Sequence, residues 1–209
     1  MTVSTVELVT PSTLLEPLTT DQAKRHLGIA SVLTDHDEYV RELIVSARET
    51  FEGDTGGYVL RDSTWLESFD TWPICKNGER AEFKLNRRPL IEVTSIQYTD
   101  ENGYVQTLDE DVYTVDANRT FPTIWLAFDQ TWPSLRGDRN GIQITYRAGY
   151  EGGEGAQETT PQNIPQDIKH ALYLKVGERF ENRQGFVEKT SSFNAYDAIV
   201  ARYTRSDYP

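Results

Sequence analysis

The chain has 209 residues, of which 37% are hydrophobic, 11% aromatic and 26% charged, and its 33 acidic and 21 basic side chains give a formal net charge of −12. Such a composition is typical of an ordered globular chain, long enough for one compact domain or two small ones, and it excludes wholesale disorder. The excess of acid argues against a protein that grips nucleic acid, because negative charges repel the phosphate backbone. Two interpretations of the excess of acidic side chains stay open. They could form an ordinary solvated surface, or they could line a channel through which DNA moves without binding.

The sequence shows no pattern of a membrane or targeting segment. No apolar run approaches the length of about 18 residues that spans a bilayer, and Met1 to Pro11 lacks the basic and apolar regions of a signal peptide. We therefore expect the protein to stay in the compartment where it is made. Cys75 is the only cysteine, so an internal disulfide and a cysteine-based metal site are excluded, and we expect a passive thiol.

The N-terminal part predicts an arm followed by two helices. Residues 1–16 show no period, and we expect an extended or mobile arm. Thr19 with Gln22 three residues later has the spacing of a capping box, which predicts a short helix over about 20–27. A second helix is predicted from near Thr34 to Gly53, because its apolar residues recur at helical spacing. These are Val40, Leu43, Ile44, Ala47 and Phe51.

Between Tyr58 and Arg147 the hydrophobic period changes to two, which indicates strands. The clearest case is Gly141 to Arg147, where apolar and polar residues alternate after a Trp-Pro turn and a polar loop. The seven predicted strands cover 64–69, 81–85, 91–99, 104–108, 112–115, 123–128 and 141–147. Short strands with turn signals at near-regular spacing predict an antiparallel block that is barrel-like or sandwich-like.

The C-terminal part predicts a Gly-rich linker after Tyr150, a long helix over about 168–182 and a short final helix over about 194–203. The simplest packing places the long helix against the 37–52 helix. The predicted fold is therefore α+β, a small helical bundle of N- and C-terminal helices with an inserted antiparallel β block. In this interpretation the arm and first helices occupy 1–56, the β block 57–150, and the linker, long helix and tail 151–209.

Tests for catalytic and metal sites find no assembled motif. The three histidines lack the two-His spacing of zinc enzymes, and the glycines at 152–155 are not followed by the Lys-Ser/Thr pair of a phosphate-binding loop. We therefore expect no catalytic residue, no metal and no cofactor. The tryptophans leave an alternative open, since they could form a sugar-stacking platform in a carbohydrate-binding domain, although aromatic residues on strands more often belong to a core. They are Trp65, Trp72, Trp125 and Trp132.

Short motifs in a fixed order run along nearly the whole chain from 17 to 203. They are Leu18-Thr19, Ala23 to Leu27, Tyr39-Val40, Leu43-Ile44, Ala47-Arg48, Thr55-Gly56, Arg88-Pro89-Leu90, Val93 to Tyr98, Asp100 to Gly103, Leu108 to Tyr113, Trp132-Pro133, Ile142 to Tyr150 and Pro165 to Arg183. In this order the sequence resembles the phage head-tail connector, or adaptor, proteins of the gp6-like superfamily, and among them the longer gp8-like branch with a β insertion. Ala201 to Arg205 stands where many relatives have Pro-Tyr-Arg.

The resemblance implies a structural virion protein without catalysis. In the family, identical subunits form a dodecameric ring in the neck, attached below the portal, which extends the DNA channel toward the tail. The implied partners are the portal protein, a stopper or other tail-side neck protein, and further copies of the chain, with no membrane and with DNA passing without specific binding. The chain is then made in the host cytoplasm and located in the virion. Another neck or tail protein, such as a stopper, stays an alternative.

Residues 192–209 carry a short predicted helix with residue types that are enriched at protein interfaces, tyrosine and arginine. We predict that this tail orders on the portal as a docking element. The residues that would make the contact are Tyr196, Ile199, Arg202, Tyr203, Arg205 and Tyr208. The alternative is that Ala195, Ala198 and Ile199 cap the helical bundle. Docking predicts that deleting 192–209 leaves the melting behaviour nearly unchanged, whereas capping predicts a loss of stability.

The charge balance gives the first testable prediction, that duplex DNA does not bind the purified chain at physiological salt. Phosphate binding requires clustered Lys and Arg, and acids dominate here. Fluorescence anisotropy with a labelled duplex measures this, and a basic DNA-binding protein serves as positive control. Tight, salt-sensitive binding would contradict a channel wall that does not retain DNA.

Overall fold

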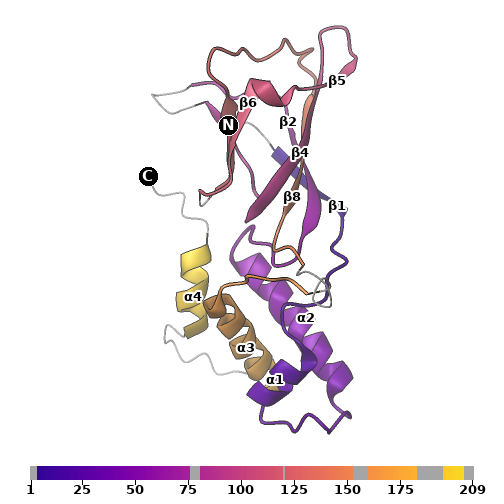
Figure 1. The fold of residues 1–209 in the computed structure, drawn as a ribbon, viewed down its shortest axis with the longest axis vertical. Coiled ribbons are helices and arrows are strands. Elements are labelled where there is room, and N and C mark those ends of the chain that lie inside the picture. The colour runs from indigo at the N-terminus through magenta and orange to yellow at the C-terminus, as the bar shows by residue number, and fades with distance from the viewer. Residues whose placement is uncertain (1–3, 76–80, 120, 153–159, 183–194, 205–209) are drawn as a thin grey trace. The chain divides into compact units, whose positions relative to one another are not determined.

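The structure is a computed structural model that describes residues 4–75, 81–119, 121–152, 160–182 and 195–204 (Figure 1). The chain divides into two compact units, each made of two segments. The first, here called the β unit, comprises Met1–Ser12 and Asp62–Gly149. The second, here called the helical unit, comprises Thr13–Arg61 and Tyr150–Pro209. By this division Met1–Ser12 belong to the β unit, whereas Tyr58 to Arg61 belong to the helical unit.

The described part of the helical unit contains four helices at the places that the sequence predicts. They are α1 (Thr20–His26), α2 (Asp37–Asp54), α3 (Gln166–Glu181) and α4 (Ala195–Tyr203). The predicted capping box at α1 is confirmed: the Thr19 hydroxyl accepts from the Gln22 amide at 3.2 Å, and the Gln22 side chain accepts from the Thr19 amide at 2.9 Å. These two bonds satisfy backbone donors that a helix start otherwise leaves open.

The predicted pairing of the long C-terminal helix with the second helix is also confirmed. Arg179 on α3 donates to the hydroxyl of Ser46 and, at 2.7 Å, to that of Thr50, both on α2. The Phe180 ring lies 6.1 Å from the Tyr39 ring of the same pair of helices. Between them lies one apolar core, whose buried members are Leu18, Ala23, Val40, Leu43, Ile44, Ala47, Phe51, Leu60, Ile164, Ile168, Ala171, Leu172, Val176, Tyr196 and Ile199.

The second helix begins at Asp37 rather than near Thr34. Residues 34–36 form a turn, in which the Asp37 amide donates to the Thr34 carbonyl at 3.0 Å. The buried Lys24 ammonium of α1 binds the Asp37 carboxylate at 2.7 Å and the Ser31 carbonyl at 2.8 Å. A buried ammonium needs such partners, so it fixes the loop between α1 and α2 and with it the start of α2.

The β unit contains two antiparallel sheets in its described residues. The five-stranded sheet has the order β1-β2-β8-β4-β5, and the three-stranded sheet the order β3-β7-β6. The strands are β1 (Ser4–Thr10), β2 (Ser63–Phe69), β3 (Glu82–Lys84), β4 (Leu90–Thr99), β5 (Val105–Thr107), β6 (Tyr113–Asp116), β7 (Thr123–Leu126) and β8 (Ile142–Ala148), with a short 3-10 turn η1 (Glu110–Val112). The described strands close no barrel, so the sandwich-like form of the prediction is the one confirmed.

Strand β1 corrects the expectation of a mobile arm. It pairs with β2 from Ser4 opposite Phe69 to Leu8 opposite Trp65. The sequence hides this strand because β1 is an edge strand whose described side chains are exposed or half-buried on both faces, so that no alternation of apolar and polar residues marks it.

The core of the β unit is mostly apolar, and one carboxylate, that of Glu67, is buried beside it. Its buried members are Phe69, Phe83, Leu85, Leu90, Ile96, Leu108, Ile124, Ile142, Ile144, Tyr146 and Ala148. Glu67 on β2 is fully buried and accepts from the Tyr146 hydroxyl at 3.0 Å, the Asn86 amide at 3.1 Å and the Asn86 side chain. Burial, followed by the Glu67 charge, raises the pKa of Tyr146 well above its ordinary value, which keeps the phenol a donor. This network joins β2, β8 and the segment after β3.

Candidate interaction surfaces

The residues predicted to dock on the portal lie mostly on α4, and the structure divides them into two groups. Tyr196 and Ile199 are buried, at 5% and 8% exposure, in the core of the helical unit. The Tyr196 hydroxyl donates to Asp54 at the end of α2 at 2.7 Å, and the Tyr203 hydroxyl donates to Asp167 at the start of α3 at 2.7 Å. These three side chains pack or hydrogen-bond on their own unit and so hold α4 in place.

Both tyrosines stay protonated donors. Burial, and after it the hydrogen bond to the carboxylate, raises the pKa of Tyr196 and of Tyr203 well above the ordinary tyrosine value. The arrangement follows from spacing, since 196, 199 and 203 are related by three and seven residues and therefore share one helix face. This spacing would place the side chains on one helix face whether that face packs on the protein's own core or binds a partner. In the structure the face packs on the core of the helical unit.

The remaining predicted contacts are Arg202, Arg205 and Tyr208. The Arg202 side chain is 71% exposed, with its guanidinium 3.7 Å from the Asp167 carboxylate. Arg205 and Tyr208 lie outside the described residues. Docking by these three side chains stays a prediction, and the described part of the tail packs on its own unit.

The tryptophans of the β unit are packed rather than displayed. Trp72 stacks on Trp132 at 4.6 Å with their rings 4° from parallel, and the Trp72 indole donates to the Pro133 carbonyl at 2.8 Å. The Phe83 ring lies about equally close to both. Trp65 also packs on this core, with the Arg87 guanidinium 4.3 Å above its ring. Three of the four tryptophans therefore support the core, which removes the basis for a sugar-stacking platform.

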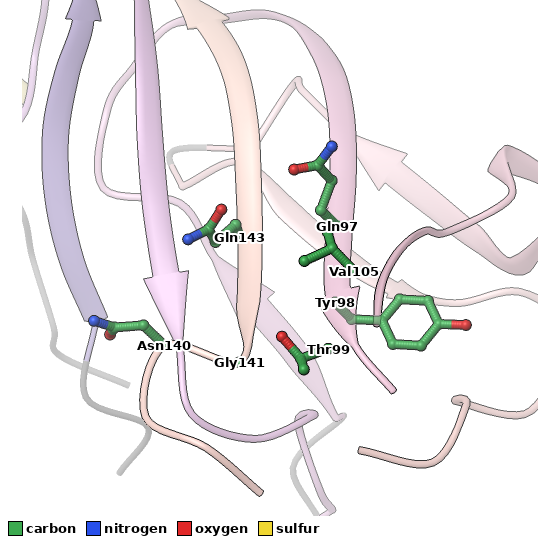
Figure 2. A pocket seen from close by; sticks show the side chains of 7 residues that line it. All are labelled: Gln97, Tyr98, Thr99, Val105, Asn140, Gly141 and Gln143. Carbon is green, nitrogen blue, oxygen red and sulfur yellow. The ribbon is translucent and has the colours of Figure 1, made fainter. Parts of the chain in front are cut away.

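A shallow pocket lies on the five-stranded sheet where β4, β5 and β8 meet (Figure 2). It is lined by Gln97, Tyr98, Thr99, Val105, Asn140, Gly141 and Gln143. Its volume of about 60 Å³ is far below the roughly 300–1,000 Å³ of typical small-molecule sites. Its lining carries no carboxylate, histidine, lysine or cysteine, so the pocket has none of the side chains that most often act as catalytic bases or nucleophiles.

Neither metal ligation nor a membrane span emerges from the geometry. Within the ranges that the structure describes, no group of three or more His, Cys, Asp or Glu side chains is placed to hold a metal ion. In those same ranges no helix is long and apolar enough to cross a membrane.

Exposed apolar side chains gather at both edges of the five-stranded sheet. Leu8 and Val9 on β1 are 45% and 52% exposed, and Tyr104 and Val105 at β5 are 68% and 67% exposed. An edge strand also presents backbone donors and acceptors that no neighbouring strand uses. No periodic pattern in the sequence marks β1, and the one signal that could have found it is its β-branched composition, STVELVT.

Comparison with solved structures shows a fold shared along nearly the whole chain. A chain in the neck of an empty gene transfer agent (GTA) particle, computed with C6 symmetry, matches with a TM-score of 0.72 and 18% identity over 98% of this chain and 97% of that one. A chain in the virion of the native GTA particle matches with a TM-score of 0.68 and 17% identity over the same shares. A chain in the native GTA neck, computed with C12 symmetry, gives 0.65 and 16%, again over 98% and 97%. No family model and no curated protein matches the sequence.

The packing of α4 gives the second prediction. Ile199→Ala should lower the free energy of unfolding by about 2–5 kcal/mol, because the change removes buried methyl groups and leaves a cavity. Arg202→Ala on the same helix is the matched control and should stay within about 0.5 kcal/mol, since its side chain is mostly exposed. Urea unfolding followed by circular dichroism measures both. Equal, small effects would mean that α4 is not part of the folded core.

Proposed function

We propose that this chain is a structural virion protein of the neck, a head-tail connector (adaptor) whose copies form a ring under the portal and extend the DNA channel toward the tail. The observation that carries the proposal is the shared fold with GTA neck chains, which extends over 98% of the chain and so includes both units. The order of sequence motifs, which resembles the connector family, supports the same role independently.

A ring is supported by the symmetry of the neighbours. Two of the matched neck structures were computed with C6 and C12 symmetry. A dodecamer, which the family resemblance implies, is compatible with both, because a twelve-fold ring contains six-fold symmetry. A closed ring uses heterologous interfaces, in which one surface of each copy meets a different surface of the next. The chain therefore needs two distinct contact surfaces for itself, besides those for the portal and for a stopper or other tail-side protein.

The chemistry of the described residues suits an assembly role. The hollow in the β unit is too small for a typical ligand, and the buried carboxylate of Glu67 is fully engaged by Tyr146 and Asn86. The proposed role requires no catalysis, cofactor or specific DNA contact. With a net charge of −12 per copy, a ring would repel DNA phosphates along its wall, which favours passage over retention.

The test is to remove the gene from the particle that encodes it and to examine lysates by negative-stain electron microscopy. Separate heads and separate tails are expected, because the piece that joins them is missing. Supplying the wild-type chain from a plasmid should restore joined particles. If α4 contributes to joining only by stabilising the fold, the Ile199→Ala chain should restore fewer joined particles than the Arg202→Ala chain. Joined, tailed particles in the absence of the chain would contradict a connector role.

A further inference from the structure

Among the residues that the structure describes, the five-stranded sheet ends on β1 and β5, and these two outer strands carry few charged side chains. The three-stranded sheet ends on β3, which carries Glu82 and Lys84, and on β6, whose Asp116 is ion-paired with Arg119 at 3.2 Å. Charged edges of this kind discourage pairing with another chain. By contrast, β1 carries a single charged side chain, Glu7, and β5 carries none. Apart from Glu7, the two outer strands of the five-stranded sheet therefore carry no charged side chain.

Both edges are also accessible. Every side chain of β5 is exposed, and so are those of β1 from Thr5 onward except the half-buried Val6. A β-bulge between Leu8 and Thr10 interrupts β1, which leaves Ser4 to Leu8 as its regular segment. That segment is long enough to pair with the three residues of β5.

One row of side chains crosses the whole sheet from edge to edge without a charge. The strand registers place Thr5 opposite Ser68, Ser68 opposite Gln143, Gln143 opposite Gln97, and Gln97 opposite Thr107. Side chains in one row share one face, because neighbouring strands in register point the same way. Gln97 and Gln143, which form the middle of this row, are visible on the strands in Figure 2. The row ends in threonine at both edges, Thr5 on β1 and Thr107 on β5.

We propose that β1 of one copy pairs with β5 of the next copy, so that the five-stranded sheets join edge to edge around the ring; this interface rests on the proposed function. The occupant is a second copy because the two edges suit each other: β1 carries one charged side chain and β5 none in a chain of net charge −12, and the register that continues the uncharged row places Thr5 beside Thr107. Four antiparallel pairings separate β1 from β5, so the two strands run in the same direction, and copies in the same orientation would pair them in parallel through main-chain hydrogen bonds. Two different edges meeting head to tail make a heterologous interface, which is what a ring requires.

The short length of β5 makes this contact weak on its own. Pairing over three residues forms few hydrogen bonds, so copies held side by side on a common platform would associate far better than free copies, through their raised effective concentration. A covalent trap at high protein concentration is therefore the appropriate test in solution.

The test uses the full chain in a Cys75→Ser background, since Cys75 is the only cysteine and is exposed. One variant carries Thr5→Cys and a second carries Thr107→Cys, two exposed threonines at opposite ends of the row. A third carries Gln143→Cys, the matched control, which is exposed on the same face but on the central strand β8. Circular dichroism first verifies that each variant is folded. A short bis-maleimide then cross-links the variants singly and in mixtures.

The mixture of Thr5→Cys and Thr107→Cys should give a covalent dimer well above either variant alone, and the double variant should give a ladder of oligomers. The mixture of Thr5→Cys with Gln143→Cys should give only the background of random collisions. Three results would overturn the proposal: no dimer above that background, as much dimer from Thr5→Cys alone, or equal yields with the control.

The outcome separates this interface from the proposed function. If heads and tails fail to join without the chain, but no edge-specific dimer forms, the connector role stands and the edge pairing is wrong. If the edge-specific ladder forms, but particles join without the chain, the pairing is correct and the connector role is wrong.

Discussion

The segment Asp62–Gly149 of the β unit, which interrupts the helical unit, begins and ends on neighbouring strands, and the rest of the structure depends on this. Ser63 at the start of β2 lies opposite Ala148 at the end of β8. Arg147 closes the same corner, with its Nε 3.2 Å from the Asp62 carboxylate and a second contact from Nη2, while its Nη1 binds Glu92 at 2.8 Å. An insertion whose two ends lie side by side interrupts a helical unit at little cost.

This cost is the conformational entropy that the chain loses on folding when α2 and α3 come together. Thr50 and Arg179, which bind each other, are 129 residues apart in sequence. Closing a flexible loop of that length carries an entropic penalty that grows with loop length. A folded insertion with adjacent ends replaces most of that loop by a fixed connection, so the helices close as if joined by a short link. The buried core of the helical unit then needs to offset a smaller loss of entropy.

Much of this organisation can be predicted from the sequence because local chemistry marks it. The capping box of Thr19 and Gln22, the apolar stripe of α2 and the alternation in β8 each place an element within a few residues. Prediction from the sequence stops where a pattern is missing or ambiguous. Strand β1 has no buried face, so no alternation reveals it, and the α4 stripe of Tyr196, Ile199 and Tyr203 has the same spacing whether it faces its own core or a partner. Only the Asp54 and Asp167 contacts decide that case.

The candidate surfaces share a physical character that suits assembly. The buried carboxylate of Glu67 is engaged by hydrogen bonds, while Leu8, Val9, Tyr104 and Val105 leave exposed apolar side chains at the two edges of the five-stranded sheet. A subunit that joins copies of itself needs preformed edges of this kind more than it needs a cavity. In the proposed role, the net charge of −12 would repel DNA phosphates.

The central claim is that many copies of this chain form a ring at the junction of head and tail. A cryo-electron microscopy map of the neck of the particle that encodes the chain tests it most directly. The account predicts a cyclic ring in which each subunit fits both the helical unit and the two-sheet β unit, with a central hole along the DNA path. A neck whose ring density fits another fold, with this chain absent from the junction, would contradict it.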